Sequence, residues 1–125
     1  MDVLDSKLPL FVVCRAFSKG HDETNVAISM VGPLIVAAPG APRAVAMFTD
    51  RAGAERSRDA HAPTHGVFEL SAPMDVAAFL WMAERHAPWV VFEPGSPNGP
   101  VRPIEIGRLI SHFETRARSE TPQAD

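Results

Sequence analysis

Two acidic residues stand directly behind apolar runs that are typical of β-strands. Asp50 follows "AVAMFT" and Glu93 follows "WVVF". If both runs are parallel strands of one sheet, their carboxyl ends meet at the edge where open α/β sheets bind ligands. Paired carboxylates at such an edge could hold a small polar molecule or a metal ion. The loop behind Glu93 would add Ser96, Asn98 and Arg102 to this candidate ligand site.

The same residues have a purely structural interpretation. Thr49 or Asp50 can cap a helix that starts with "RAGAERS", because a side-chain oxygen at this position accepts a free backbone N–H. An aspartate also interacts favourably with the positive end of the helix dipole. Glu93 is then a surface residue, and "EPGSPNGP" only turns the chain. We favour this interpretation and keep the ligand site as the alternative.

The sequence contains none of the usual phosphate-binding or nucleophile motifs, such as G-x-G-x-x-G, a P-loop or G-x-S-x-G. Its one cysteine, Cys14, lies in the apolar run "LFVVC" and is predicted to be a buried, unreactive thiol. His61 and His65 have a spacing known from metal sites, but Pro63 prevents a helix between them and no complete zinc set accompanies them. We therefore expect no catalytic residue, no metal centre and no cofactor, and favour a non-enzymatic protein over an enzyme.

Composition sets broad limits on the protein class. A chain of 125 residues with 46% hydrophobic and 22% charged residues is expected to fold as one domain. The net charge of −3 removes the electrostatic reason to expect nucleic-acid binding. The apolar runs are too short to span a membrane, and "MDVLDSK" is acidic where a signal peptide needs positive charge. Together with the single cysteine, these features predict a cytoplasmic protein.

The first half of the chain is predicted to form β-strands. "LPLFVVCRAF" and "NVAISMVG" are β-type runs. A hairpin is indicated where Leu34–Ala38 and Ala44–Phe48 flank "PGAP", because proline and glycine suit the central positions of a turn. Further on, strand and helix patterns alternate, so right-handed crossovers would make Ala44–Phe48, Val67–Leu70 and Trp89–Phe92 parallel.

These elements predict a single α/β domain. We expect a mixed sheet of about five strands, with an N-terminal antiparallel hairpin followed by β-α-β-α-β-α, flanked by helices. The domain is expected to span residues 8–116, between an N-terminal extension at 1–7 and a flexible tail at 117–125.

The helix predicted around Val76–Ala83 carries more apolar surface than one sheet can cover. A stripe at helical spacing would face the sheet, while Trp81 and Met82 extend the apolar arc beyond it. Tryptophan and methionine are enriched in the cores of protein interfaces. The helix is therefore a candidate interface for a protein partner or a second copy. Alternatively, the closing helix or the N-terminal segment covers both side chains.

Two segments resemble the SseB-like (enhanced serine sensitivity) N-terminal domain family of bacteria. "AVAMFTDRAGAERS" is similar to that family's strand-to-helix segment, and "WVVFEPGSPNGPVRPIEIGRLI" is similar to its penultimate strand, loop and closing helix. The resemblance covers Leu8 to Phe113, although Glu93 stands where the family pattern has a small polar residue. It implies the same order of elements and a bacterial cytoplasmic setting, and it transfers no catalytic residue.

Two functions remain. The favoured one is a non-enzymatic interaction or regulatory domain that uses the Val76–Ala83 helix. The alternative is a small-molecule binding protein, or a weak enzyme, that uses the candidate ligand site.

Overall fold

The computed structural model describes residues 8–21, 26–37, 42–93 and 103–120. Within these ranges the chain is a single α/β domain, with a mixed open sheet of seven strands flanked by three helices. The elements are β1 (Leu10–His21), β2 (Val26–Pro33), β3 (Ile35–Val36), β4 (Ala44–Phe48), α1 (Arg51–His61), β5 (Gly66–Leu70), α2 (Pro73–Ala83), β6 (Trp89–Phe92), β7 (Ile104–Glu105) and α3 (Ile106–Glu120).

The long strand β1 organises the sheet. It pairs antiparallel with β2, β4 and β5, while β4 continues the sheet through a parallel pair with β6 and β6 pairs antiparallel with β7. β2 pairs with β1, whereas β3, which follows it directly, pairs with β4. Between β2 and β3, the Leu34 amide donates to the Val13 carbonyl at 2.9 Å, and the Leu34 carbonyl accepts from the Ala46 amide at 3.0 Å.

The α/β class, the mixed sheet and the flanking helices are confirmed, and the expected count of about five strands is corrected to seven. The predicted hairpin is present as β3 and β4, which pair antiparallel with Ile35 opposite Val45. Its turn, residues 38–41, lies outside the described residues. The strand that the sequence did not predict is β7, whose two residues are too few to leave a periodic pattern.

The predicted common direction of Ala44–Phe48, Val67–Leu70 and Trp89–Phe92 is confirmed, but Val67–Leu70 is not hydrogen-bonded to either of the other two strands. This segment forms β5, which pairs antiparallel with the opposite edge of β1, with Leu70 opposite Leu10. β4 and β5 therefore point in the same direction but are separated by β1. The physical reason is that the first half of β1 is buried on both faces and pairs along both edges, so it can take one strand on each side.

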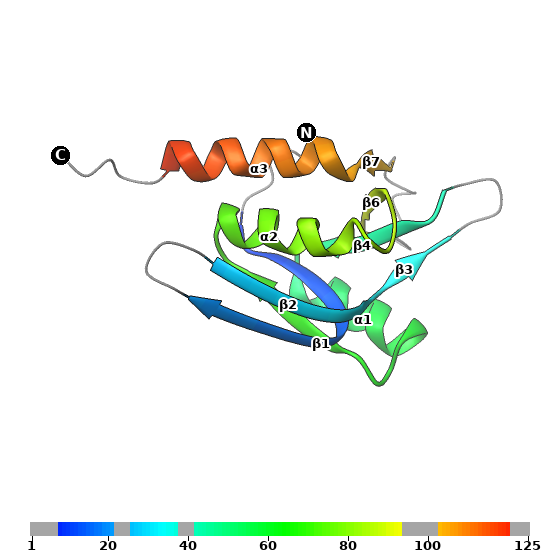
Figure 1. Cartoon of the computed structure of the whole chain (residues 1–125). Helices are drawn as coiled ribbons and strands as arrows, with labels where there is room; N and C mark the ends of the chain where they lie inside the picture. The colour runs from blue at the N-terminus through cyan, green and yellow to red at the C-terminus, as the bar shows by residue number, and fades with distance from the viewer. Residues whose placement is uncertain (1–7, 22–25, 38–41, 94–102, 121–125) are drawn as a thin grey trace.

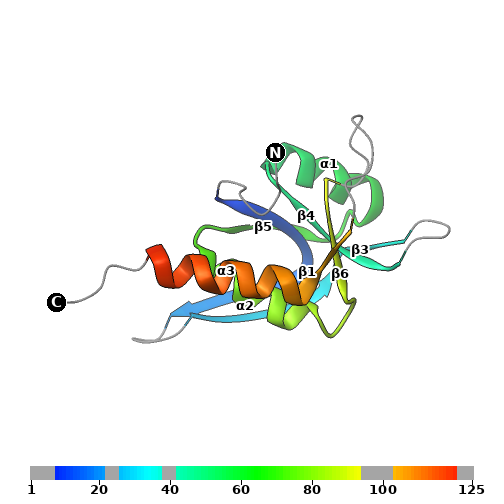
Figure 2. The ribbon, with the colours of Figure 1, turned by 90° about the horizontal axis from the view of Figure 1, so that it is seen from above.

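Helices cover both faces of the sheet. Helices α2 and α3 run side by side in opposite directions on one face, and α1 lies on the other (Figures 1 and 2). The alternation of β1 explains this arrangement, since Leu10 and Val12 point to the α2–α3 side and Phe11 and Val13 point to the α1 side. No helix in the described part of the chain is long and apolar enough to cross a membrane.

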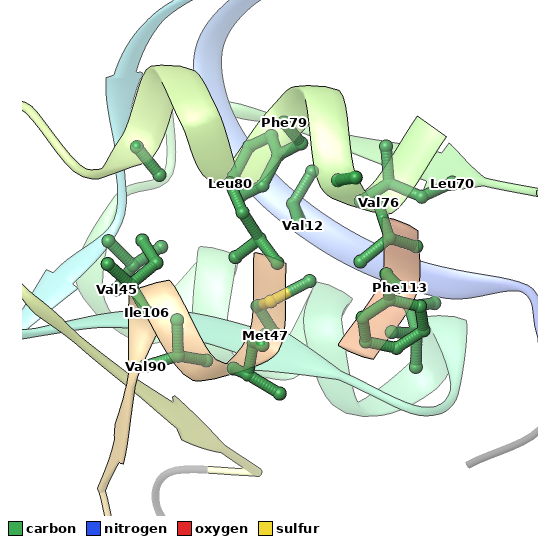
Figure 3. Close-up of a cluster of buried hydrophobic side chains, with 14 of the residues drawn as sticks. Val12, Val45, Met47, Leu70, Val76, Phe79, Leu80, Val90, Ile106 and Phe113 are labelled. Atoms are coloured by element: carbon green, nitrogen blue, oxygen red, sulfur yellow. The ribbon is translucent and has the colours of Figure 1, made fainter. Parts of the chain in front are cut away.

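Two buried clusters result. The larger one fills the space between the sheet and helices α2 and α3 (Figure 3), and it includes Val12, Val45, Met47, Leu70, Val76, Phe79, Leu80, Val90, Ile106 and Phe113. The smaller one, under α1, contains Phe11, Val13, Leu34, Ala46, Phe48, Ala54 and Ala62. Because α2 packs on the sheet and on α3 together, its wide apolar arc is largely used inside the domain.

The closing helix extends past residue 116, the predicted end of the domain. α3 continues to Glu120 and Ala117 is buried, so residues 117–120 belong to the helix rather than to a flexible tail. The remainder of that predicted tail, 121–125, and the predicted extension, 1–7, lie outside the described residues.

Candidate functional site

The carboxyl end of β4 leads directly into α1 through Asp50. This residue has an extended backbone, with φ −138° and ψ 152°, and its Oδ1 accepts from the Gly53 amide at 2.5 Å. These are the features of a helix N-cap, in which the side chain replaces a missing intrahelical partner. The predicted role of "FTD" as a strand end and helix cap is confirmed at Asp50.

Glu93, at the carboxyl end of β6, has a structural role that the sequence did not indicate. Its Oε1 accepts hydrogen bonds from the Thr49 backbone amide and from the Thr49 hydroxyl, the latter at 2.6 Å. Its own amide donates to the Met47 carbonyl at 3.0 Å, and its φ of 53° lies in a region that non-glycine residues rarely occupy. Glu93 is thus not a free surface carboxylate, because it joins the ends of two parallel strands.

The Asp50 and Glu93 carboxylates approach the same point, Gly53 in the first turn of α1. A Cβ atom added to Gly53 would lie 3.2 Å from Asp50 Oδ1 and 3.3 Å from Glu93 Oε2. The guanidinium of Arg56 would lie 3.7 Å from the same atom. A glycine here leaves room for two carboxylates and a cation to converge.

The sequence contained a signal for this convergence. A glycine inside a short helix is unfavourable by about 1 kcal/mol relative to alanine, so its presence needs a reason. Here the reason is the space that the two carboxylates occupy beside Gly53. Thr49 and Arg56, which complete the arrangement, were not among the residues predicted for the ligand site.

Arg51, the first residue of α1, contacts residues of β1 and β5. Arg51 places its guanidinium carbon 5.1 Å from the centre of the Phe11 ring, and one of its nitrogens lies 4.0 Å from a Glu69 oxygen. Ser71 donates to the other Glu69 oxygen at 3.0 Å. Arg51 and Glu69 are both about half exposed, so this ion pair contributes little to stability.

The remaining predicted ligand residues, Ser96, Asn98 and Arg102, lie outside the described residues. Among the residues that are described, no three His, Cys, Asp or Glu side chains are placed to hold a metal ion. The described part of the candidate ligand site is therefore the Asp50 and Glu93 carboxylates, each already accepting a hydrogen bond from the backbone. The guanidinium of Arg56 lies beside them.

The predicted interface residues behave differently from each other. Met82 is half buried and packs against the larger core. Trp81 is 55% exposed, and its indole N–H donates to Glu114 Oε2 of α3 at 3.3 Å. The closing helix thus contacts Trp81 without covering it. Met74, in the first turn of α2, is also exposed, at 42%.

Helical spacing places Met74, Ala78 and Trp81 on one side of α2, since residues four and three positions apart are neighbours on a helix surface. We call these three residues the outer α2 face. Exposed large hydrophobic residues in the described ranges are Val31, Met74 and Trp81. Two of the three thus lie on the outer α2 face.

Cys14 is fully buried, and burial raises the pKa of its thiol to about 12. Desolvation disfavours the charged thiolate, which is the reactive form. The predicted burial of this cysteine is therefore confirmed, and its thiol is protonated at neutral pH.

A feature that the sequence analysis missed is a depression of about 340 Å³ where α3 begins. It is lined by Glu84, Pro88, Trp89, Glu105, Ile106 and Gly107. Two of these lining residues are hydrogen-bonded, since the Ile106 amide donates to the Pro88 carbonyl at 3.0 Å. Its lining comes from three separate segments, so no local sequence motif indicates it.

The comparisons with known proteins do not assign the chain to a family. No model of a known protein family matches the sequence, and no curated protein matches it either. The resemblance to the SseB-like family therefore stays a prediction.

Proposed function

We propose that this protein is a non-enzymatic interaction domain that pairs with a second copy of itself through the outer α2 face. The observation that carries the proposal is the exposure of Trp81. Its only polar atom is already bonded to Glu114, so the surface that Trp81 presents to a partner is the apolar ring. Desolvated tryptophan rings are among the strongest contributors to protein interfaces.

The shape of the outer α2 face supports pairing with an identical copy. Large side chains, Met74 and Trp81, flank the small Ala78. In a twofold pair of antiparallel α2 helices, Ala78 lies near the axis and allows the helices to approach, while Met74 of one copy reaches Trp81 of the other. Contacts between a methionine sulfur and an aromatic ring are favourable.

The test is the solution mass of the full chain, measured by light scattering at increasing concentration. We expect the wild type to reach twice the 13.5 kDa mass of one chain. Trp81→Ala is expected to remain near the monomer mass with an unchanged circular dichroism spectrum, because Trp81 contributes little to the core. The matched control is Val31→Ala, which removes a side chain of similar exposure (53%) from β2 and is expected to leave the dimer intact.

Two results would refute this proposal. One is a wild type that stays at the monomer mass over the whole concentration range. The other is a Trp81→Ala variant that dimerises as strongly as the wild type, which would place the interface elsewhere.

A second candidate function is small-molecule binding at the end of β4 and β6. It is supported by the convergence of Asp50, Glu93 and Arg56 on Gly53 from separate parts of the chain. A panel of small polar ligands is expected to contain one that raises the melting temperature, since a ligand at 100 times its Kd stabilises the native state by about 2.7 kcal/mol. The shift should be lost in Asn98→Ala and Arg102→Ala, and its absence across the panel would count against this function.

Membership of the SseB-like family and a cytoplasmic location are retained as proposals. They are supported by the sequence segments around Asp50 and Glu93 and by the single, buried cysteine.

A further inference from the structure

We draw no further inference here: the strongest candidate, the depression at the beginning of α3 between Glu84, Trp89 and Glu105, combines two carboxylates with a helix N-terminus, and no buried unpartnered side chain or other second feature in the described part of the chain indicates which ligand it would hold.

Discussion

Lys19 and Asp75 form an ion pair that attaches the β1–β2 hairpin to the first turn of α2. Lys19 Nζ lies 2.5 Å from Asp75 Oδ2, and the same oxygen accepts from the Ala72 amide at 3.2 Å. The two side chains differ in burial, because Asp75 is 1% exposed and Lys19 is 25% exposed. Removing one partner or the other should therefore have unequal costs.

Lys19→Met keeps most of the side-chain length and removes the charge. Among the described residues, this leaves the buried Asp75 carboxylate with the Ala72 amide as its one partner. Breaking a buried pair in this way costs about 3–5 kcal/mol. Asp75→Asn leaves Lys19, whose partial exposure allows water to replace the lost partner. The cost is then that of one hydrogen bond to a charged group, about 1.5–3 kcal/mol.

The assay is urea unfolding of the full chain, with the free energy of unfolding extrapolated to water. We expect Lys19→Met to be less stable than Asp75→Asn. The double variant should be more stable than the sum of the single effects predicts, by about 0.5–3 kcal/mol, because it leaves no buried charge without a partner. Glu69→Gln, which breaks the exposed pair with Arg51, is the control and should change stability by less than about 1 kcal/mol.

A Lys19→Met variant within about 0.5 kcal/mol of the wild type would refute the reasoning, because changes of that size are typical of ordinary surface substitutions. A larger loss in Asp75→Asn than in Lys19→Met would refute it as well. High salt provides a further check, since partly buried pairs are screened less than exposed ones and the difference between the two single variants should persist.

Three further predictions concern local features. Gly107→Ala in α3, where an added Cβ meets nothing within 4 Å, should stabilise the protein by about 0.4–1 kcal/mol, and Gly53→Ala should gain less in the same unfolding assay because its Cβ meets two carboxylate oxygens. Asp50→Ala should lower the free energy of unfolding by about 1 kcal/mol because the helix cap is missing, while Asp50→Ser should retain most of the wild-type stability. Equal stability of the two variants would contradict the capping role. The Cys14 thiol should resist alkylation in the native protein and react after unfolding in urea. Because burial raises its pKa from 9.0 to about 12, the folded state holds its proton more tightly, so stability should fall as the pH rises from about 9 toward 12, and less steeply in Cys14→Ser.

Much of this protein follows from its sequence because the forces involved are local. The Asp50 cap acts on an amide three residues away, and the wide apolar arc of α2 is a property of eleven consecutive residues. The β3–β4 hairpin needs only a short turn between two apolar runs. For such elements the residue pattern itself carries the structural information, since helix and strand periodicities differ.

The tertiary structure decided the contacts between distant parts of the chain. Thr49 meets Glu93 across 44 residues and Lys19 meets Asp75 across 56 residues, and no spacing in the sequence encodes either distance. The placement of β5 beside β1 was equally unpredictable, because a strand pattern shows which face is buried but not which neighbour provides the backbone hydrogen bonds. Whether Trp81 is covered depends on how closely α3 packs against α2, which is set by the fit of the whole core.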